Sequence, residues 1–146
     1  MTVVRMNERH ITALAELERV CFSAPWSENA LREELTNPHA VFLVAEDDAG
    51  AVLGYVGMHH ILDEADVTNV AVFPASRRKG VARALMTAVE TYGREQKLVR
   101  VTLEVRESNA PAIALYEGFG YRQDGRRKRF YTDPVEDALL YSRYFS

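Results

Sequence analysis

The stretch from Asn69 to Ala82 reads NVAVFPASRRKGVA and decides the fold of this chain. Its first residues are mostly β-branched or aromatic, which predicts the end of a β-strand. Pro74 stops that strand, and a basic turn containing one glycine follows. From Val81 to Val89 the apolar residues recur at helical spacing, so the longest helix begins directly after the turn. A strand, a basic turn and a helix in this order predict an α/β fold.

Outward from this stretch, the periodicity of apolar residues predicts a continuous alternation of strands and helices. The expected helices are 11–22, 27–37, 81–92 and 109–119, and the expected strands are 1–5, 41–45, 52–61, 65–73, 99–105, 121–131 and 138–144. In the strand 65–73, simple alternation puts Val67, Asn69 and Ala71 on one face. Both faces of that strand are largely apolar, so we expect it in the centre of the sheet.

Composition narrows the class of protein. A chain of 146 residues is a common size for one domain, so we expect a single α/β domain over residues 1–146. Hydrophobic residues make up 47% and charged residues 27%, a balance typical of soluble globular proteins. A net charge of -3 argues against a direct nucleic-acid partner, and no apolar run is long enough to cross a membrane. The first residues lack the layout of a signal peptide, so we expect a cytoplasmic protein.

The basic turn is the first candidate binding site. Successive backbone N–H groups at a helix N-terminus form a concave, partly positive donor array that suits a pyrophosphate. Arg77, Arg78 and Lys79 add charge around Gly80. On these residues alone, a solvated turn in which the glycine merely starts the helix is an equally good interpretation.

The sequence of this turn also resembles a motif of a known protein family. Arg77, Gly80 and Ala82 fit the coenzyme A pyrophosphate motif of the Gcn5-related N-acetyltransferase superfamily, which they resemble in spacing and context. The resemblance implies a single-domain fold with a central, mixed, mostly antiparallel twisted sheet flanked by about four helices. It also implies acetyl-coenzyme A as co-substrate. The cofactor-binding residues implied in this way are the backbone of Val70, Ala71 and Val72 and the loop residues Arg77, Arg78, Lys79, Gly80, Val81 and Ala82.

A second set of segments is similar to one subfamily, the ribosomal-protein-alanine N-acetyltransferases. These segments are Cys21–Ser27, Leu103–Asn109, Ala114–Tyr121 and Tyr131–Ala138. The similarity implies that Glu104 is the general base, that Tyr116 is the general acid and that Asn109 binds the pantetheine arm of the cofactor. The implied partner is the N-terminal alanine of the eighteenth small-subunit ribosomal protein. Without the resemblance, these three residues would be interpreted as a surface carboxylate, a core aromatic and a helix N-cap.

The implied roles agree with the chemistry of direct acetyl transfer. The attacking amine must be neutral and the departing thiolate must gain a proton, so one proton acceptor and one donor are needed on opposite sides of the thioester. An α-amine has a pKa of about 7.7 to 8.0, and deprotonating it at neutral pH costs only about 1 kcal/mol. For a lysine side chain the cost is about 4.6 kcal/mol. A modest base such as Glu104 is therefore sufficient for a protein N-terminus.

Two other functions stay open at this point: acetylation of lysine side chains or small amines, and acyl-coenzyme A binding without catalysis.

No metal site is expected, because the neighbours His59 and His60 point to opposite faces of a strand. The single cysteine, Cys21, is expected to be a buried structural thiol. An acidic cluster attracts a basic peptide if its members share the mouth of the cleft, and a solvated loop is the alternative interpretation. Its members are Asp63, Glu64, Asp66, Glu104 and Glu107.

Overall fold

The computed structural model describes residues 1–145, in which helices and strands alternate as the sequence predicts. The strands are β1 (Thr2–Arg5), β2 (Ala40–Glu46), β3 (Val52–Ile61), β4 (Glu64–Val72), β5 (Arg100–Arg106), β6 (Arg122–Tyr131) and β7 (Glu136–Tyr144). The helices are α1 (Ile11–Cys21), α2 (Glu28–Glu34), α3 (Val81–Glu95) and α4 (Ala110–Gly118), with short 3-10 turns at Glu8–His10 and Pro74–Ser76. The expected boundaries agree with these to within a few residues.

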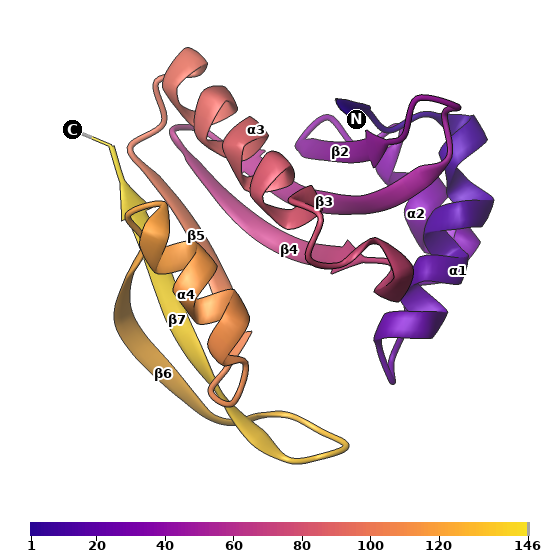
Figure 1. Cartoon of the computed structure of the whole chain (residues 1–146). Helices are drawn as coiled ribbons and strands as arrows, with labels where there is room; N and C mark the ends of the chain where they lie inside the picture. Colours follow the sequence, from indigo (N-terminus) through magenta and orange to yellow (C-terminus); the bar gives the residue numbers. More distant parts are fainter. Residues whose placement is uncertain (146) are drawn as a thin grey trace.

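Over residues 1–145 the strands form one seven-stranded sheet in the order β1-β2-β3-β4-β5-β7-β6 (Figure 1). Every neighbouring pair is antiparallel except β4 and β5, which run parallel. The expectation of a mixed, mostly antiparallel sheet with a central strand at β4 is confirmed. No helix in this range is long and apolar enough to span a membrane.

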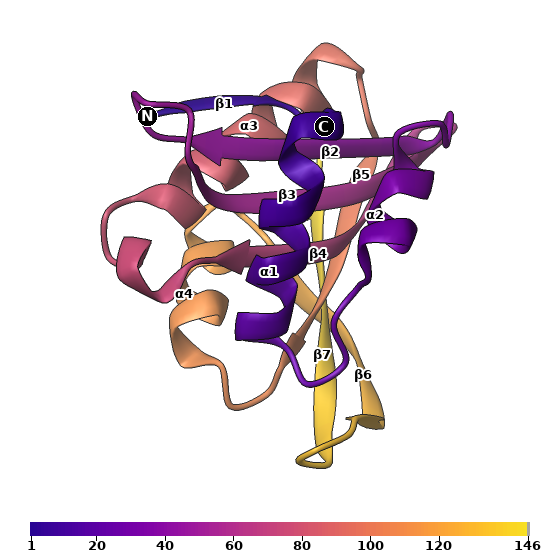
Figure 2. The same ribbon diagram turned by 90° about the vertical axis from the view of Figure 1, so that its right-hand side faces the viewer.

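The helices cover the two faces of the sheet in pairs, with α1 and α2 on one face and α3 and α4 on the other (Figure 2). Each face has its own hydrophobic core. The core under α3 and α4 contains Leu85, Val89 and Tyr116, while the core under α1 and α2 contains Leu14 and Leu31. Since all of these side chains are nearly inaccessible to solvent, burial of apolar surface holds both helix layers on the sheet.

One prediction about β4 is wrong. The pairing of β3 with β4 skips Thr68, so this residue forms a β-bulge. A bulge adds one residue to one strand and reverses the facing of the side chains that follow it. Val67 therefore packs in the core under α3, whereas Asn69 and Ala71 face α1, and these three residues do not share one face.

The central strands separate at one end. β4 and β5 are paired only from Glu64 to Asp66, against Arg100 to Thr102. Beyond these residues β5 stays paired with β7 along its whole length, while β4 follows β3 in another direction. Figure 1 shows β4 and β5 side by side at one end and apart at the other. A pocket lies in the space between the diverging strands.

Candidate active site

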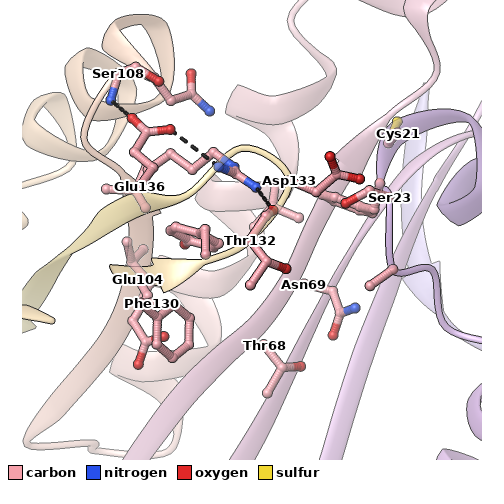
Figure 3. A pocket seen from close by; sticks show the side chains of 18 of the residues that line it. Cys21, Ser23, Thr68, Asn69, Glu104, Ser108, Phe130, Thr132, Asp133 and Glu136 are labelled. Carbon is pink, nitrogen blue, oxygen red and sulfur yellow. Dashed lines mark hydrogen bonds and ion pairs between the residues drawn. The ribbon is translucent and has the colours of Figure 1, made fainter. Parts of the chain in front are cut away.

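A pocket of about 700 Å³ opens between β4 and β5 (Figure 3). Its floor and sides come from the two strands, one wall from the end of α1 and the segment that leads to α2, and another from the loop between β6 and β7. The lining includes Glu18, Cys21–Ala24, Trp26, Val67–Val70, Leu103–Arg106, Ser108, Asn109, Tyr116, Phe130–Pro134 and Glu136. Four separate segments of the chain thus meet around one cavity.

Glu104 lies on β5 and lines this pocket, with 27% of its side chain exposed. Partial burial raises the pKa of its carboxyl group, Arg127 on β6 lowers it, and Asp66 raises it slightly. The guanidinium Nε of Arg127 is 3.6 Å from the Glu104 Oε1 atom. A carboxylate with a raised pKa is a stronger base, and it is in contact with the space that a ligand can enter.

Tyr116 lies on α4 and reaches the same pocket from the face of the sheet that α3 and α4 cover, with only 6% of its surface exposed. Burial, with a smaller contribution from Tyr131, raises the pKa of its phenol to about 12. Burial also raises the pKa of Tyr131 to about 12, and the charge of Glu104 adds to this. Both hydroxyl groups therefore stay protonated at neutral pH and are able to donate a proton.

Asn109 lines the pocket and also caps α4, because its Oδ1 atom accepts a hydrogen bond of 3.3 Å from the backbone N–H of Ala112. The amide nitrogen is the part of this side chain that does not take part in the cap. Both interpretations made from the sequence are thus compatible at this position.

The predicted pyrophosphate loop lies past the end of β4, outside the pocket lining. Arg77, Arg78, Lys79 and Gly80 are exposed, and α3 begins at Val81. Arg78 and Gly80 have positive φ angles of 62° and 81°, a conformation that glycine adopts without strain. The first helical bond runs from the Ala84 N–H to the Gly80 carbonyl, and within residues 1–145 no side chain caps the N–H groups before it. Those groups are the donors that an anion would meet.

Of the three residues on β4 whose backbone is predicted to bind the cofactor, only one lines the pocket. Val70 lines the pocket, whereas Ala71 and Val72 lie between it and the loop. The carbonyl of Val72 accepts a hydrogen bond of 3.2 Å from the Arg77 Nε. This side chain therefore fixes the end of β4, and its positive charge is held beside the strand.

The prediction that Cys21 is a buried structural thiol is wrong. The side chain is half-buried and lines the pocket. Its Sγ atom lies 3.6 Å from the Val72 carbonyl and 3.5 Å from the Arg77 Nη2. The apolar neighbours in the sequence were misleading because α1 ends at this residue, where the pocket begins.

The five acidic residues considered for the cleft mouth do not all gather there. Of these residues only Glu104 lines the pocket. Glu64 pairs with Arg100 at 2.9 Å, and Glu107 pairs with Arg126 at 2.9 Å. Arginine neighbours offset the charge of Glu64 and Glu107, which favours the alternative interpretation of these two residues as part of a solvated surface.

The loop between β6 and β7 is fixed over the pocket by Arg106, a residue that sequence reasoning did not single out. Its guanidinium donates to the carbonyls of Thr132 and Pro134 at 3.2 and 3.1 Å and to the Glu136 carboxylate at 3.3 Å. It also lies 4.4 Å from the centre of the Tyr131 ring. Figure 3 shows the bonds that join Ser108, Glu136 and this guanidinium. The contacts of Arg106 therefore hold the loop that forms this wall of the pocket. In the sequence, the motif Tyr131–Ala138 marked the loop.

Residues 11–121 match the acetyltransferase (GNAT) family. The chain belongs to the GNAT family. It is 30% identical over 141 residues to the [ribosomal protein bS18]-alanine N-acetyltransferase of Escherichia coli (strain K12), covering 95% of this chain and 94% of that protein. It is 38% identical over 139 residues to a Bacillus subtilis (strain 168) protein that carries the same name provisionally, covering 94% and 91%.

The structural comparison agrees. The crystal structure of the ribosomal-protein-S18-alanine N-acetyltransferase from Escherichia coli superposes with a TM-score of 0.90 at 28% identity, covering 99% of this chain and 94% of that one. The GNAT fold expected from the sequence is thus confirmed. Within residues 1–145 this GNAT chain has no group of three His, Cys, Asp or Glu side chains placed to hold a metal ion. His59 contacts Glu34 and His60 contacts Tyr92, on opposite faces of β3.

Replacing Arg127 with alanine is expected to raise the pKa of Glu104, because the removed guanidinium favours the charged carboxylate. With Glu104 as the general base, which acts when it is deprotonated, the acid limb of the pH profile of kcat/KM is expected to move to higher pH. Since both side chains are partly exposed, we expect a shift of about half a pH unit. Lys128→Ala, which removes the same charge from the next residue, is the control and should leave the limb in place. An identical profile for the Arg127 variant would contradict the assignment of Glu104 as the base.

Proposed function

We propose that this GNAT chain, as one acetyltransferase domain over residues 1–146, transfers the acetyl group of acetyl-coenzyme A to the N-terminal α-amine of a protein. We further propose that its acceptor is the N-terminal alanine of ribosomal protein bS18, the reaction named for the Escherichia coli relative. One observation carries the proposal. The half-buried carboxylate of Glu104 and the protonated phenol of Tyr116 come from different elements and line the same pocket between β4 and β5.

In this proposal Glu104 is the general base. It removes a proton from the attacking α-amine, directly or through a water molecule, and the amine nitrogen forms a bond to the thioester carbonyl carbon. The raised pKa of Glu104 supports this role because it brings the base closer in strength to the amine. The acetyl group passes directly from coenzyme A to the α-amine, without a covalent acyl-enzyme, and the acceptor is not a lysine side chain.

Tyr116 is proposed as the general acid. As the carbon–sulfur bond breaks, its hydroxyl group gives a proton to the coenzyme A thiolate, and solvent later restores the proton. With a pKa of about 12, the phenol stays protonated across the physiological pH range. Burial also supports the role, since a proton donor that is shielded from water interacts more strongly with a developing negative charge.

The proposed binding of acetyl-coenzyme A uses the groups implied by the family motif. The N–H groups at the start of α3 receive the pyrophosphate, with Arg78 and Lys79 adding positive charge at the exposed loop. The backbone of Val70, Ala71 and Val72 along the free side of β4 and the amide of Asn109 hold the pantetheine arm. β4 supports this arrangement because it runs continuously from the pocket to the loop.

The test is acetylation of a peptide that begins with the N-terminal alanine of bS18. Thiol release from acetyl-coenzyme A should depend on this peptide, and mass spectrometry should find one acetyl group on its α-amine. The matched control is the same peptide with a blocked N-terminus and a lysine inside. Transfer to the blocked peptide would favour a lysine acceptor. Tight binding of acetyl-coenzyme A without release of thiol with any amine would make the chain a binding module.

A further inference from the structure

A buried polar chain links α1 to the pocket. Glu18 on α1 is 1% exposed, and its Oε2 atom accepts a hydrogen bond of 2.7 Å from the hydroxyl of Tyr55 on β3. Its Oε1 atom accepts a bond of 2.9 Å from the backbone N–H of Trp26, in the segment between α1 and α2. The side-chain nitrogen of Asn69 on β4 lies 3.5 Å from the same Oε2. Glu18, Trp26 and Asn69 all line the pocket.

One atom of this chain has no partner. Among the residues that the structure describes, the Oδ1 of Asn69 is the buried side-chain oxygen or nitrogen without a hydrogen bond. The residue is only 7% exposed, so bulk water does not compensate for the missing partner. Buried polar atoms are nearly always satisfied, and an exception at the wall of a pocket indicates a place for a ligand donor.

The neighbours of Asn69 fix which of its two amide atoms is free. Glu18 presents an acceptor oxygen, because the same atom already accepts from the Tyr55 hydroxyl. Burial raises the pKa of Tyr55, which keeps this hydroxyl protonated and donating. Turning the Asn69 amide around would place its oxygen against the carboxylate oxygen. The amide nitrogen therefore faces Glu18, and the oxygen is the atom left without a donor in the free protein.

The position of Asn69 indicates which substrate supplies the donor. The bulge at Thr68 turns Asn69 toward the face of the sheet that α1 covers, beside Trp26 and the segment between α1 and α2. The loop proposed for the coenzyme A pyrophosphate belongs to α3, which packs on the opposite face. A donor on the α1 side therefore comes from the acceptor peptide rather than from the cofactor.

We propose that the Asn69 Oδ1 atom accepts a hydrogen bond from a main-chain N–H group at the N-terminus of the acceptor peptide, and that Glu18 and Tyr55 hold the amide in the orientation that this requires. The inference rests on the proposed function. It assigns a peptide-binding role to the strand residue that precedes Val70 and makes the bulge at Thr68 part of substrate recognition. Figure 3 shows Asn69 and Glu104 on the two strands that flank the pocket.

The test is steady-state kinetics of Asn69→Leu, which keeps the size of the side chain and removes the acceptor. KM for the alanine-starting peptide should rise about tenfold, the usual effect of one lost hydrogen bond, while KM for acetyl-coenzyme A stays within about twofold. Tm should fall by no more than a few degrees, because the variant removes a buried oxygen that has no partner in the free enzyme together with the 3.5 Å contact to Glu18. Asn29→Leu, at an exposed position on α2, is the matched control and should change neither constant.

Tyr55→Phe adds a second measurement in case the leucine variant does not fold. It frees the Glu18 carboxylate from one donor while Asn69 stays intact, and we expect a smaller rise in the peptide KM. An effect on the acetyl-coenzyme A KM alone, or unchanged peptide constants in both variants, would overturn the assignment to the peptide while leaving the proposed function in place. A wild-type enzyme that does not acetylate the peptide would overturn both.

Discussion

Replacing Glu104 with glutamine is expected to lower kcat for an alanine-starting peptide by about two orders of magnitude, the size of a typical general-base contribution. Glutamine keeps the shape of the side chain and its place in the pocket, so KM for acetyl-coenzyme A should change little. The deficit should narrow as the pH rises above about 8, where the α-amine is already neutral. Initial rates of thiol release from pH 6 to 9.5 measure both effects.

Glu107→Gln is the matched control for this variant. Glu107 lies three residues further along the chain, outside the pocket lining, and its carboxylate pairs with Arg126. Its replacement should leave kcat unchanged. If Glu104→Gln retained full activity at neutral pH, the chain would remain an acetyltransferase by family, but the base would have to be another group.

Replacing Tyr116 with phenylalanine is expected to lower kcat by about a hundredfold, because the thiolate must then leave without a proton from the enzyme. The ring stays in place, so we expect Tm to fall by no more than a few degrees. Tyr121→Phe is the matched control. Tyr121 is a buried tyrosine whose ring centre lies 6.0 Å from that of Tyr116, yet it lies outside the pocket lining.

The same assay measures both variants against wild type at saturating acetyl-coenzyme A, with Tm recorded in parallel. Equal losses for Tyr116→Phe and Tyr121→Phe would indicate a packing defect rather than a missing acid. A loss confined to Tyr116→Phe, at unchanged Tm, would support the proton donor.

Most of the fold could be predicted because its elements repeat their periodicity over many residues. Alternation along β5 and the apolar stripe of α3 depend only on the local sequence, and both elements begin within a residue or so of the predicted positions. The bulge at Thr68 could not be predicted in this way. It is set by how β4 pairs with β3, and nothing in the alternation of β4 itself marks the extra residue.

The candidate site was partly accessible from the sequence. The motifs led to Glu104 and Tyr116, and the structure brings both into one pocket. The free oxygen of Asn69 could not be found from the sequence, since it depends on where Glu18 and Tyr55 lie after folding. The environment of Cys21 was missed for a similar reason. Local apolar neighbours indicate burial, but they carry no information about the end of a helix that borders a cavity.

The outer edges of the sheet also bear on how copies of this protein behave at high concentration. The sheet ends in β1 and β6, and an unpaired strand edge is a template on which another chain can add and aggregate. β1 has only four residues, too few to support much pairing. β6 is longer, but five of its ten residues are lysine or arginine, and all five are exposed. Repulsion between these positive charges disfavours edge-to-edge stacking of two copies. Where β4 leaves β5, by contrast, the unpaired backbone of both strands faces the pocket, whose walls come from the segment after α1 and from the loop between β6 and β7.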